Sequence, residues 1–527
     1  MLARHHKYAN ATLVRYARVL SSSSASTSSS SSSTSTSTAQ APRGALAVLG
    51  ALGVGLGAYT LASQRPEFAQ YVPSFAASAA ITDPARDACA ADDDATRARR
   101  LSRWLSAHGG ALDKCALKPA RNGYSGVSAY YDDDHGGGKT MNRSKRRGKE
   151  EEIMRVPESA VVSCATATRH PTLFHTYDAL LRDGTLDERL AVMVFLMIER
   201  RRGEESVWKD YIDALPRRYD TPLYFQNDEL DRELKGTNVY GAAKAQAQSL
   251  KKVFELKVTP AMGALIQADN AAGGNLHAQA PPAFEEFKWA YATFWSRVLA
   301  IPVGDGTHEL ESIVPGIDMV NHVIDAKYAN ARWEYVADAS RSDGGYVALI
   351  SPRNRKLEDG EELFMNYGDK SNEELLFTYG FADDDNENDV LALQPPWANE
   401  PVEDRSSDVN ARVARLAAEG LPQHVILPRV PPKRGYRDLD PTTQHILRIW
   451  VSDDVENSAS KPSAETVARV HRALRGAIGD RSSALRRIER DVDERTSTAR
   501  ERACAAYRRS MRRAIDRYLD AAAAWPR

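Results

Sequence analysis

Two short segments of the chain carry polar side chains of the kind that bind ligands or take part in catalysis. In residues 314–323, VPGIDMVNHV, an apolar run ends in Asn321 and His322. In residues 360–381, GEELFMNYGDKSNEELLFTYGF, a strand-like run ends at Tyr367. Amide, imidazole and phenol groups all form hydrogen bonds with ligands. Each segment alone also has a structural interpretation, because Asn321 could cap a helix, His322 could be a core histidine and Tyr367 could pack or lie in a turn.

Taken together, the two segments resemble the motif pair of SET-domain methyltransferases. That pair is an Asn-His dipeptide after an apolar strand, followed further along by Gly-Glu-Glu, an apolar run and Tyr-Gly. The tail K-S-N-x-E-L-L-x-x-Y-G-F at residues 370–381 is similar to the branch that contains the Rubisco large-subunit lysine methyltransferase. The resemblance extends over about residues 100–525, and it is weakest in the C-terminal helices.

This resemblance implies a protein methyltransferase that uses S-adenosyl-L-methionine, with lysine as the expected target. The branch also includes protein-histidine methyltransferases, and an inactive SET module that binds partner proteins is a further alternative. A lysine amine has a pKa near 10.4, so making it neutral at pH 7 costs about 4.6 kcal/mol. A desolvated channel supplies part of this by lowering that pKa. The remainder of catalysis is expected to come from positioning and electrostatics.

Four residues take site roles by this resemblance. Tyr367 matches the catalytic tyrosine of the SET fold. Asn321 and His322 match residues that hold the cofactor. Arg297, in the segment FWSRV, matches an arginine that contacts the carboxylate of the cofactor. These roles are implied by the family and not by the spacing of the residues.

The cofactor loop and the substrate channel involve four further positions. Tyr124, in RNGYSGV, stands in the place of the N-terminal cofactor loop, although the acidic residue usual there is missing. Asp318 and Tyr379 match positions that line the channel for the substrate lysine. Ile301 replaces a second substrate-side arginine of the family, so the preferred peptide is expected to differ from that of the Rubisco enzyme.

The segments that must position these residues predict an α+β fold. Strands are expected at residues 126–131, 153–156, 344–352 and 362–367, and long helices at 188–201 and 284–299. We therefore expect a SET β-fold over residues 101–390, split by a helical insert over about residues 180–285. Residues 391–527 are expected to form an all-α domain of the substrate-binding type. Helical patterns in that domain cover residues 408–420, 442–452, 464–477 and 482–523.

The N-terminus has a different composition from the rest of the chain. Residues 1–43 are basic, rich in serine and free of acidic residues, which is typical of an organelle transit peptide. Residues 44–62 carry no charge and are long enough to span a bilayer as a single transmembrane helix. Residues 63–100 are expected to be a linker. The expected location is the mitochondrion, at its inner membrane, with a plastid, a cleaved presequence or a disordered tail as alternatives.

The bulk composition excludes several other classes of protein. The formal net charge is −1, so the chain as a whole shows no bias toward nucleic acid. The four cysteines form no C-x-x-C pair, and neither a zinc cluster nor a disulfide framework is indicated. No metal site is therefore predicted, and the expected partner is a protein substrate. Hydrophobic residues make up 42% of the chain, which is enough for a sizeable core.

Overall fold

The computed structural model describes residues 93–120, 126–132, 150–303, 308–338, 344–352, 357–398, 400, 402–452, 462–490, 492–493 and 496–525. The predicted leader, the predicted membrane segment and most of the predicted linker lie outside the described residues. Within the described ranges, no helix is long and apolar enough to cross a membrane.

Two compact units make up the described chain. The sheet unit contains the residues up to Tyr219 together with Gln248–Tyr367. The helical unit contains Asp220–Ala247 and Gly368–Arg527.

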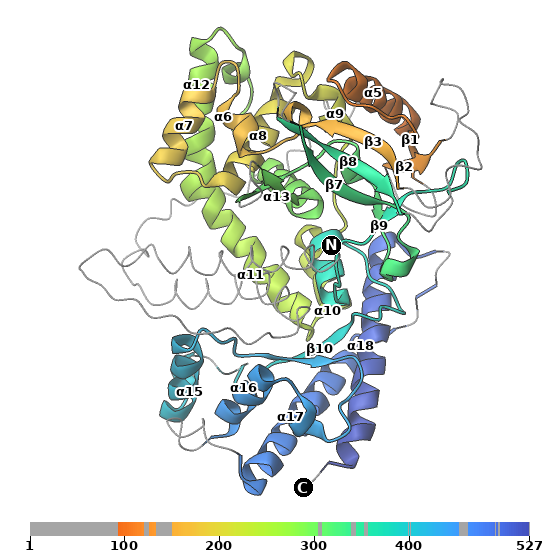
Figure 1. Ribbon diagram of the computed structural model, residues 1–527. Helices are drawn as coiled ribbons and strands as arrows, with labels where there is room; N and C mark the ends of the chain where they lie inside the picture. The colour runs from red at the N-terminus through yellow and green to blue at the C-terminus, as the bar shows by residue number, and fades with distance from the viewer. Residues whose placement is uncertain are drawn as a thin grey trace, which may run out of the picture. The chain divides into compact units, whose positions relative to one another are not determined.

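Three antiparallel strands form the largest sheet of the sheet unit, in the order β3 (Glu151–Pro157), β8 (Gly345–Ser351) and β7 (Arg332–Ala337). β8 lies in the middle and is almost entirely buried, as expected for valine, leucine and isoleucine in a central strand. β7 forms an edge and is mostly half-buried. Figure 1 shows these strands side by side. The strands predicted at 153–156 and 344–352 are confirmed.

A short parallel pair joins the two motif segments. β6 (Asn321–His322) lies beside β9 (Phe364–Met365), with Asn321 opposite Phe364. The two segments that the sequence analysis singled out are therefore neighbours in the fold. Tyr367 follows β9 by two residues, which places it near the end of this pair.

Two hairpins complete the strands described in this unit. β1 (Cys115–Pro119) pairs with β2 (Val127–Tyr131), close to the strand predicted at 126–131. β4 (Leu299–Val303) pairs with β5 (His308–Ser312). The hairpin of β4 and β5 begins directly after the helix that carries Arg297.

The sheet unit also contains helices. The α-helices are α5 (Asp94–Ala107), α6 (Cys164–Thr168), α7 (Phe174–Arg182), α8 (Glu188–Arg202), α9 (Lys209–Ala214), α12 (Thr259–Ala271) and α13 (Phe284–Arg297). In α8, the Asp187 side chain accepts a hydrogen bond from the Leu190 backbone and caps the first turn. Every residue of α8 from Leu190 to Glu199 is buried, as its apolar sequence predicts. The helix α11 (Asn238–Val253) runs through the division between the units.

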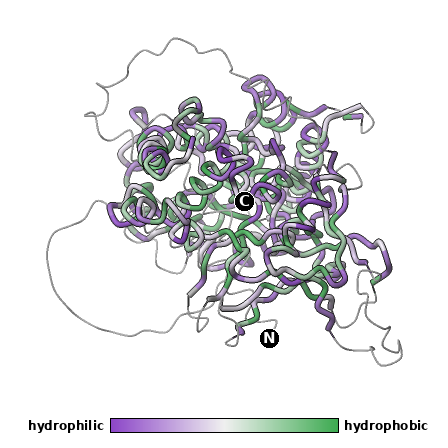
Figure 2. Tube along the Cα trace, turned by 90° about the horizontal axis from the view of Figure 1, so that it is seen from above, coloured by the Kyte–Doolittle hydropathy of each residue, from purple (hydrophilic) through white to green (hydrophobic). Residues whose placement is uncertain are grey.

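The helical unit is built on α10 (Asn227–Leu234), α14 (Asn372–Glu374), α15 (Ser407–Ala418), α16 (Pro441–Val451), α17 (Ala464–Arg486) and α18 (Ala499–Ala523). Its core contains large apolar side chains from these helices, including Leu447, Leu474 and Ile515. Figure 2 shows hydrophobic and hydrophilic residues alternating along the helical stretches of the trace, as expected for helices with one buried face.

Two expectations for this region were wrong. It is not all-α, because β10 (Val390–Leu393) and β11 (Val425–Pro428) form an antiparallel pair of apolar residues, most of them buried. The helix predicted over 482–523 is two helices. α18 begins only at Ala499, where Thr498 and Glu501 form a capping box that fixes a new helix start.

Candidate active site

The segment that runs from Gly316 to His322 connects the candidate site residues of the sheet unit. Gly316 has a φ of 86°, and a Cβ at this position would lie 2.8 Å from a methyl carbon of Leu105. Glycine is therefore required at this turn, both by its backbone conformation and by the lack of space. After this turn, the backbone carbonyl of Asp318 accepts a hydrogen bond from Arg297, and that of Val320 accepts one from Tyr367.

Tyr367 is held by hydrogen bonds of both its side chain and its backbone. Its hydroxyl donates to the Val320 carbonyl over 2.6 Å, and its backbone N–H donates to Nδ1 of His322 over 3.0 Å. The two rings lie with centroids 4.9 Å apart. Since Nδ1 of His322 accepts a hydrogen bond, a neutral imidazole carries its proton on Nε2. Tyr367 is half-buried, so part of the residue is accessible from solvent.

Asn321 is fixed by two side chains that the sequence analysis did not single out. Its amide nitrogen donates to Oγ of Ser128 over 3.0 Å and to Oε1 of Glu362 over 2.8 Å. Glu362 is buried and belongs to the Gly-Glu-Glu motif, so the motif itself pointed to it. Ser128 lies in β2, and no signal in the sequence distinguishes it from other strand residues. With its amide nitrogen engaged, Asn321 can offer its carbonyl oxygen to a ligand.

Arg297 and Asp318 form an ion pair. Nη1 of Arg297 lies 3.1 Å from Oδ2 of Asp318 and donates to the backbone carbonyl of the same residue over 2.8 Å. The Asp318 side chain is fully buried, and Oδ2 also accepts from the Tyr211 hydroxyl over 2.9 Å. Burial raises the pKa of Asp318, while Arg297 and the Tyr211 hydroxyl pull it down. Tyr211 is another residue that the sequence analysis missed.

Two candidates remain, Tyr379 and Tyr124. Tyr379 belongs to the helical unit, where it ends a π-helical stretch (Leu375–Tyr379) before Gly380 in left-handed conformation. Single π turns often occur at functional sites. Burial raises the pKa of Tyr379, and the charge of Glu374 adds to the shift. Tyr124 lies outside the described residues. The structure thus brings together five of the seven predicted site residues: Arg297, Asp318, Asn321, His322 and Tyr367.

Next to this π-helical stretch, Glu373 is buried in a polar network of the helical unit. It accepts hydrogen bonds from Asn238 over 3.0 Å and from the Tyr507 hydroxyl over 2.8 Å. Burial raises the pKa of Glu373 from its ordinary 4.5 to about 7, partly opposed by the charge of Arg481. The folded chain therefore binds this proton more tightly than the unfolded chain does.

The contribution of Glu373 to the stability of the protein is expected to fall as the pH rises from about 4.5 to about 7, and to stay constant above that range. Glu373→Gln keeps an acceptor for its partners and removes the titration. We expect this variant to be more stable than the parent at pH 8 by on the order of 1–3 kcal/mol. Urea unfolding at pH 5 and pH 8 measures the difference. Asp480→Asn, an acid-to-amide change at an exposed residue of α17, is the control for the substitution itself.

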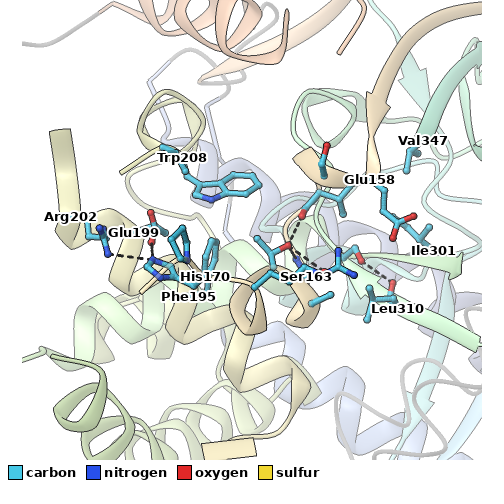
Figure 3. Close-up of a pocket in the computed structure, with 18 of the residues that line it drawn as sticks. Glu158, Ser163, His170, Phe195, Glu199, Arg202, Trp208, Ile301, Leu310 and Val347 are labelled. Carbon is cyan, nitrogen blue, oxygen red and sulfur yellow. Dashed lines mark hydrogen bonds and ion pairs between the residues drawn. The ribbon is translucent and has the colours of Figure 1, made fainter. Parts of the chain in front are cut away.

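A cavity of about 280 Å³ lies on the sheet unit, and none of the six candidates that the structure describes lines it. Figure 3 shows part of its wall, with Phe195, Trp208, Ile301, Leu310 and Val347 as apolar surface. Ile301, which stands where the family has a second substrate-side arginine, therefore lines this cavity. The volume is near the lower limit of ligand pockets, which start at about 300 Å³.

His170 and Glu199 line the same cavity and are hydrogen-bonded to each other. Nδ1 of His170 accepts from the backbone N–H groups of Thr172 and Leu173, over 3.2 and 3.1 Å. This fixes the ring proton on Nε2, which faces Glu199 at 3.0 Å. Both nitrogens of the ring are therefore occupied by structural contacts. The pair serves packing, as a buried histidine commonly does.

Comparison with known proteins agrees with this geometry. The fold is similar to the crystal structure of the SET domain of LSMT bound to lysine and AdoHcy, with a TM-score of 0.57 and 18% identity, over 80% of this chain and 90% of that one. It is also similar to Rubisco LSMT bound to AdoMet, with a TM-score of 0.55 and 18% identity, over 80% and 91% of the two chains. The chain therefore has a mixed helix and sheet fold of the SET type, and the resemblance seen in the motifs is confirmed.

Curated relatives cover a shorter stretch. An actin-histidine N-methyltransferase of Drosophila melanogaster is 29% identical over 209 residues, which are 38% of this chain and 37% of the relative. A ribosomal lysine N-methyltransferase of Schizosaccharomyces pombe is 28% identical over 208 residues, or 39% and 33% of the two chains. The match thus spans between a third and two fifths of each of these relatives. No protein-family model matches the chain.

Proposed function

We propose that this chain transfers a methyl group from S-adenosylmethionine to a side chain of another protein, and that the side chain is lysine. The observation that supports this most is the placement of Tyr367. Its hydroxyl is fixed on the Val320 carbonyl, one residue before the Asn321 and His322 pair. A SET-type fold and relatives that methylate proteins support the same class of reaction.

The residues present fit the charged amino-acid end of this cofactor. The carbonyl oxygen of Asn321 suits the ammonium group, because the amide nitrogen is already engaged by Ser128 and Glu362. Within the described chain, Nε of Arg297 is buried and has no hydrogen-bond partner, so a donor is left for a carboxylate. Charge-assisted bonds of this kind contribute about 1.5–3 kcal/mol each.

The bound cofactor would supply an electrophilic methyl group on a sulfonium. Around it, the chain has to orient an uncharged amine and exclude water. The Tyr367 hydroxyl donates a hydrogen bond to the Val320 carbonyl, so its oxygen can still act as an acceptor. Such an oxygen favours positive charge nearby without acting as a strong nucleophile. The fixed hydroxyl therefore suits a preorganised polar environment for the transfer.

The two kinds of relative leave histidine as the second candidate target. Lysine is our proposal because the segment at residues 370–381 resembles the Rubisco lysine methyltransferase. The test is to incubate the purified chain with labelled S-adenosylmethionine and an organelle extract, and to identify the modified residue by mass spectrometry. Label on lysine supports the proposal, and label on histidine replaces lysine by histidine. An extract that stays unlabelled favours the alternative of an inactive, partner-binding module.

We also propose that the N-terminal residues direct the protein to the mitochondrion and that residues 44–62 hold it in the inner membrane. The support is the acid-free basic leader followed by an uncharged run. A fusion of residues 1–70 to a fluorescent protein is expected to co-purify with mitochondria and to resist carbonate extraction. A diffuse cytosolic signal would contradict the targeting, and plastid signal in a plant cell would change the organelle. Signal that is washed out by carbonate would contradict the anchor alone.

A further inference from the structure

We propose that Tyr211 is a positioning residue of the active site, which sets Arg297 by fixing Asp318. This inference rests on the proposed function, since it takes Arg297 as a residue that holds the cofactor. The Tyr211 hydroxyl reaches the Asp318 carboxylate, and Asp318 reaches Arg297.

Both oxygens of the Asp318 carboxylate are occupied. Oδ1 accepts from the backbone N–H of Gly316 over 3.0 Å. Oδ2 accepts from the Tyr211 hydroxyl over 2.9 Å and from Arg297 over 3.1 Å. A fully buried carboxylate with three donors is poorly placed to accept a substrate amine as well. Its role in this geometry is to hold Arg297 and the turn at Gly316.

Tyr211 is itself held rigidly, which a positioning residue requires. It lies in the short helix α9, is fully buried and has its ring 6.2 Å from that of Trp104, in a stacked arrangement. Trp104 in turn donates to the Val207 carbonyl over 2.6 Å, just before the start of α9. Trp208, which Figure 3 labels, packs on Trp104 with ring centroids 5.3 Å apart. The phenol therefore has little freedom to follow a displaced Asp318.

The hydroxyl of Tyr211 shares Oδ2 with Arg297, and this sharing sets how strongly the carboxylate holds the guanidinium. Without the hydroxyl, Arg297 becomes the remaining side-chain donor to Oδ2 among the described residues. The guanidinium is then drawn toward Asp318 and is less available to a second anion. Tyr211→Phe should therefore weaken cofactor binding about five- to thirtyfold, although its hydroxyl is hydrogen-bonded to Asp318 and not to Arg297.

The test is a calorimetric titration of S-adenosylhomocysteine into the full chain and its variants. Tyr177→Phe is the matched control, because Tyr177 is also fully buried in the sheet unit and its hydroxyl has no hydrogen-bond partner in the described structure. We expect Tyr211→Phe to weaken binding and Tyr177→Phe to leave it within about twofold. Melting temperatures of both variants are measured in parallel, since a purely structural role would lower the melting temperature without changing the affinity.

A double-mutant cycle shows whether Tyr211 acts through Asp318. In an Asp318→Asn background, Tyr211→Phe should have little further effect on affinity, because the charged acceptor is already lost. Additive losses, or an unchanged affinity of Tyr211→Phe, would overturn the inference while leaving the proposed function intact. A parent chain that does not bind the probe would overturn both.

Discussion

Tyr367→Phe is expected to lower the rate of methyl transfer about a hundred- to thousandfold. The change removes the hydroxyl that donates to the Val320 carbonyl and leaves a ring that still packs beside His322. Loss of one preorganised polar group at a reacting centre typically costs about 2.7–4 kcal/mol of transition-state stabilisation. The backbone hydrogen bond of Tyr367 to His322 is unaffected by the substitution, so the local fold should persist.

Single-turnover transfer, cofactor titration and thermal unfolding of the same variant separate the possible roles of Tyr367. A catalytic role predicts a slow rate with an affinity and a melting temperature close to those of the parent. A packing role predicts a lower melting temperature and a near-normal rate. A parent and a variant that are both inactive would indicate a binding module. Normal transfer by the variant would exclude Tyr367 as the catalytic residue.

Arg297→Ala is expected to have the largest effect on stability, about 3–5 kcal/mol, because it leaves the buried Asp318 carboxylate without its cation. The same change should weaken cofactor affinity about ten- to hundredfold, since a charge-assisted bond is lost. Urea unfolding and calorimetric titration measure the two effects. In the double variant with Asp318→Asn, part of the stability should return, because no unpaired charge remains.

A comparison with an exposed ion pair serves as the control. Arg155 and Glu152 lie 2.6 Å apart, with side chains 39% and 30% exposed. Arg155→Ala should cost about 1 kcal/mol or less, since water screens such pairs. If Arg297→Ala were no more damaging than Arg155→Ala, the ion pair with Asp318 would not be a buried structural contact. An unchanged cofactor affinity would in addition remove Arg297 from the binding site.

The sequence predicted the parts of the site that follow from local pattern. A strand ending near Tyr367 was visible, and the family resemblance placed it beside Asn321 and His322. The parallel pairing of β6 and β9 confirms that placement. The apolar run before Asn321 was wrongly predicted as a strand, because it contains a 3-10 helix (Ile317–Met319) and the strand begins only at Asn321. The α8 and α13 helices were likewise predictable, because each combines an apolar face with charged ends.

The sequence could not show contacts between distant parts of the chain. Ser128 lies 193 residues from Asn321, and Tyr211 lies 107 residues from Asp318. Only the fold determines that these pairs meet. The family-implied role of Asp318 in a substrate channel stays a prediction, and its three hydrogen-bond donors favour a structural role. The pair β10 and β11 was missed because each strand is only four residues long.

The central claim is tested most directly by measuring how many methyl groups leave the cofactor and reach protein. The purified chain is mixed with an equimolar amount of methyl-labelled S-adenosylmethionine and with protein extract, and both S-adenosylhomocysteine and protein-bound label are quantified over a single turnover. The account predicts that the two products appear together in equal amounts and that Tyr367→Phe slows both alike. Binding of the cofactor with no S-adenosylhomocysteine formed and no label in protein would contradict it.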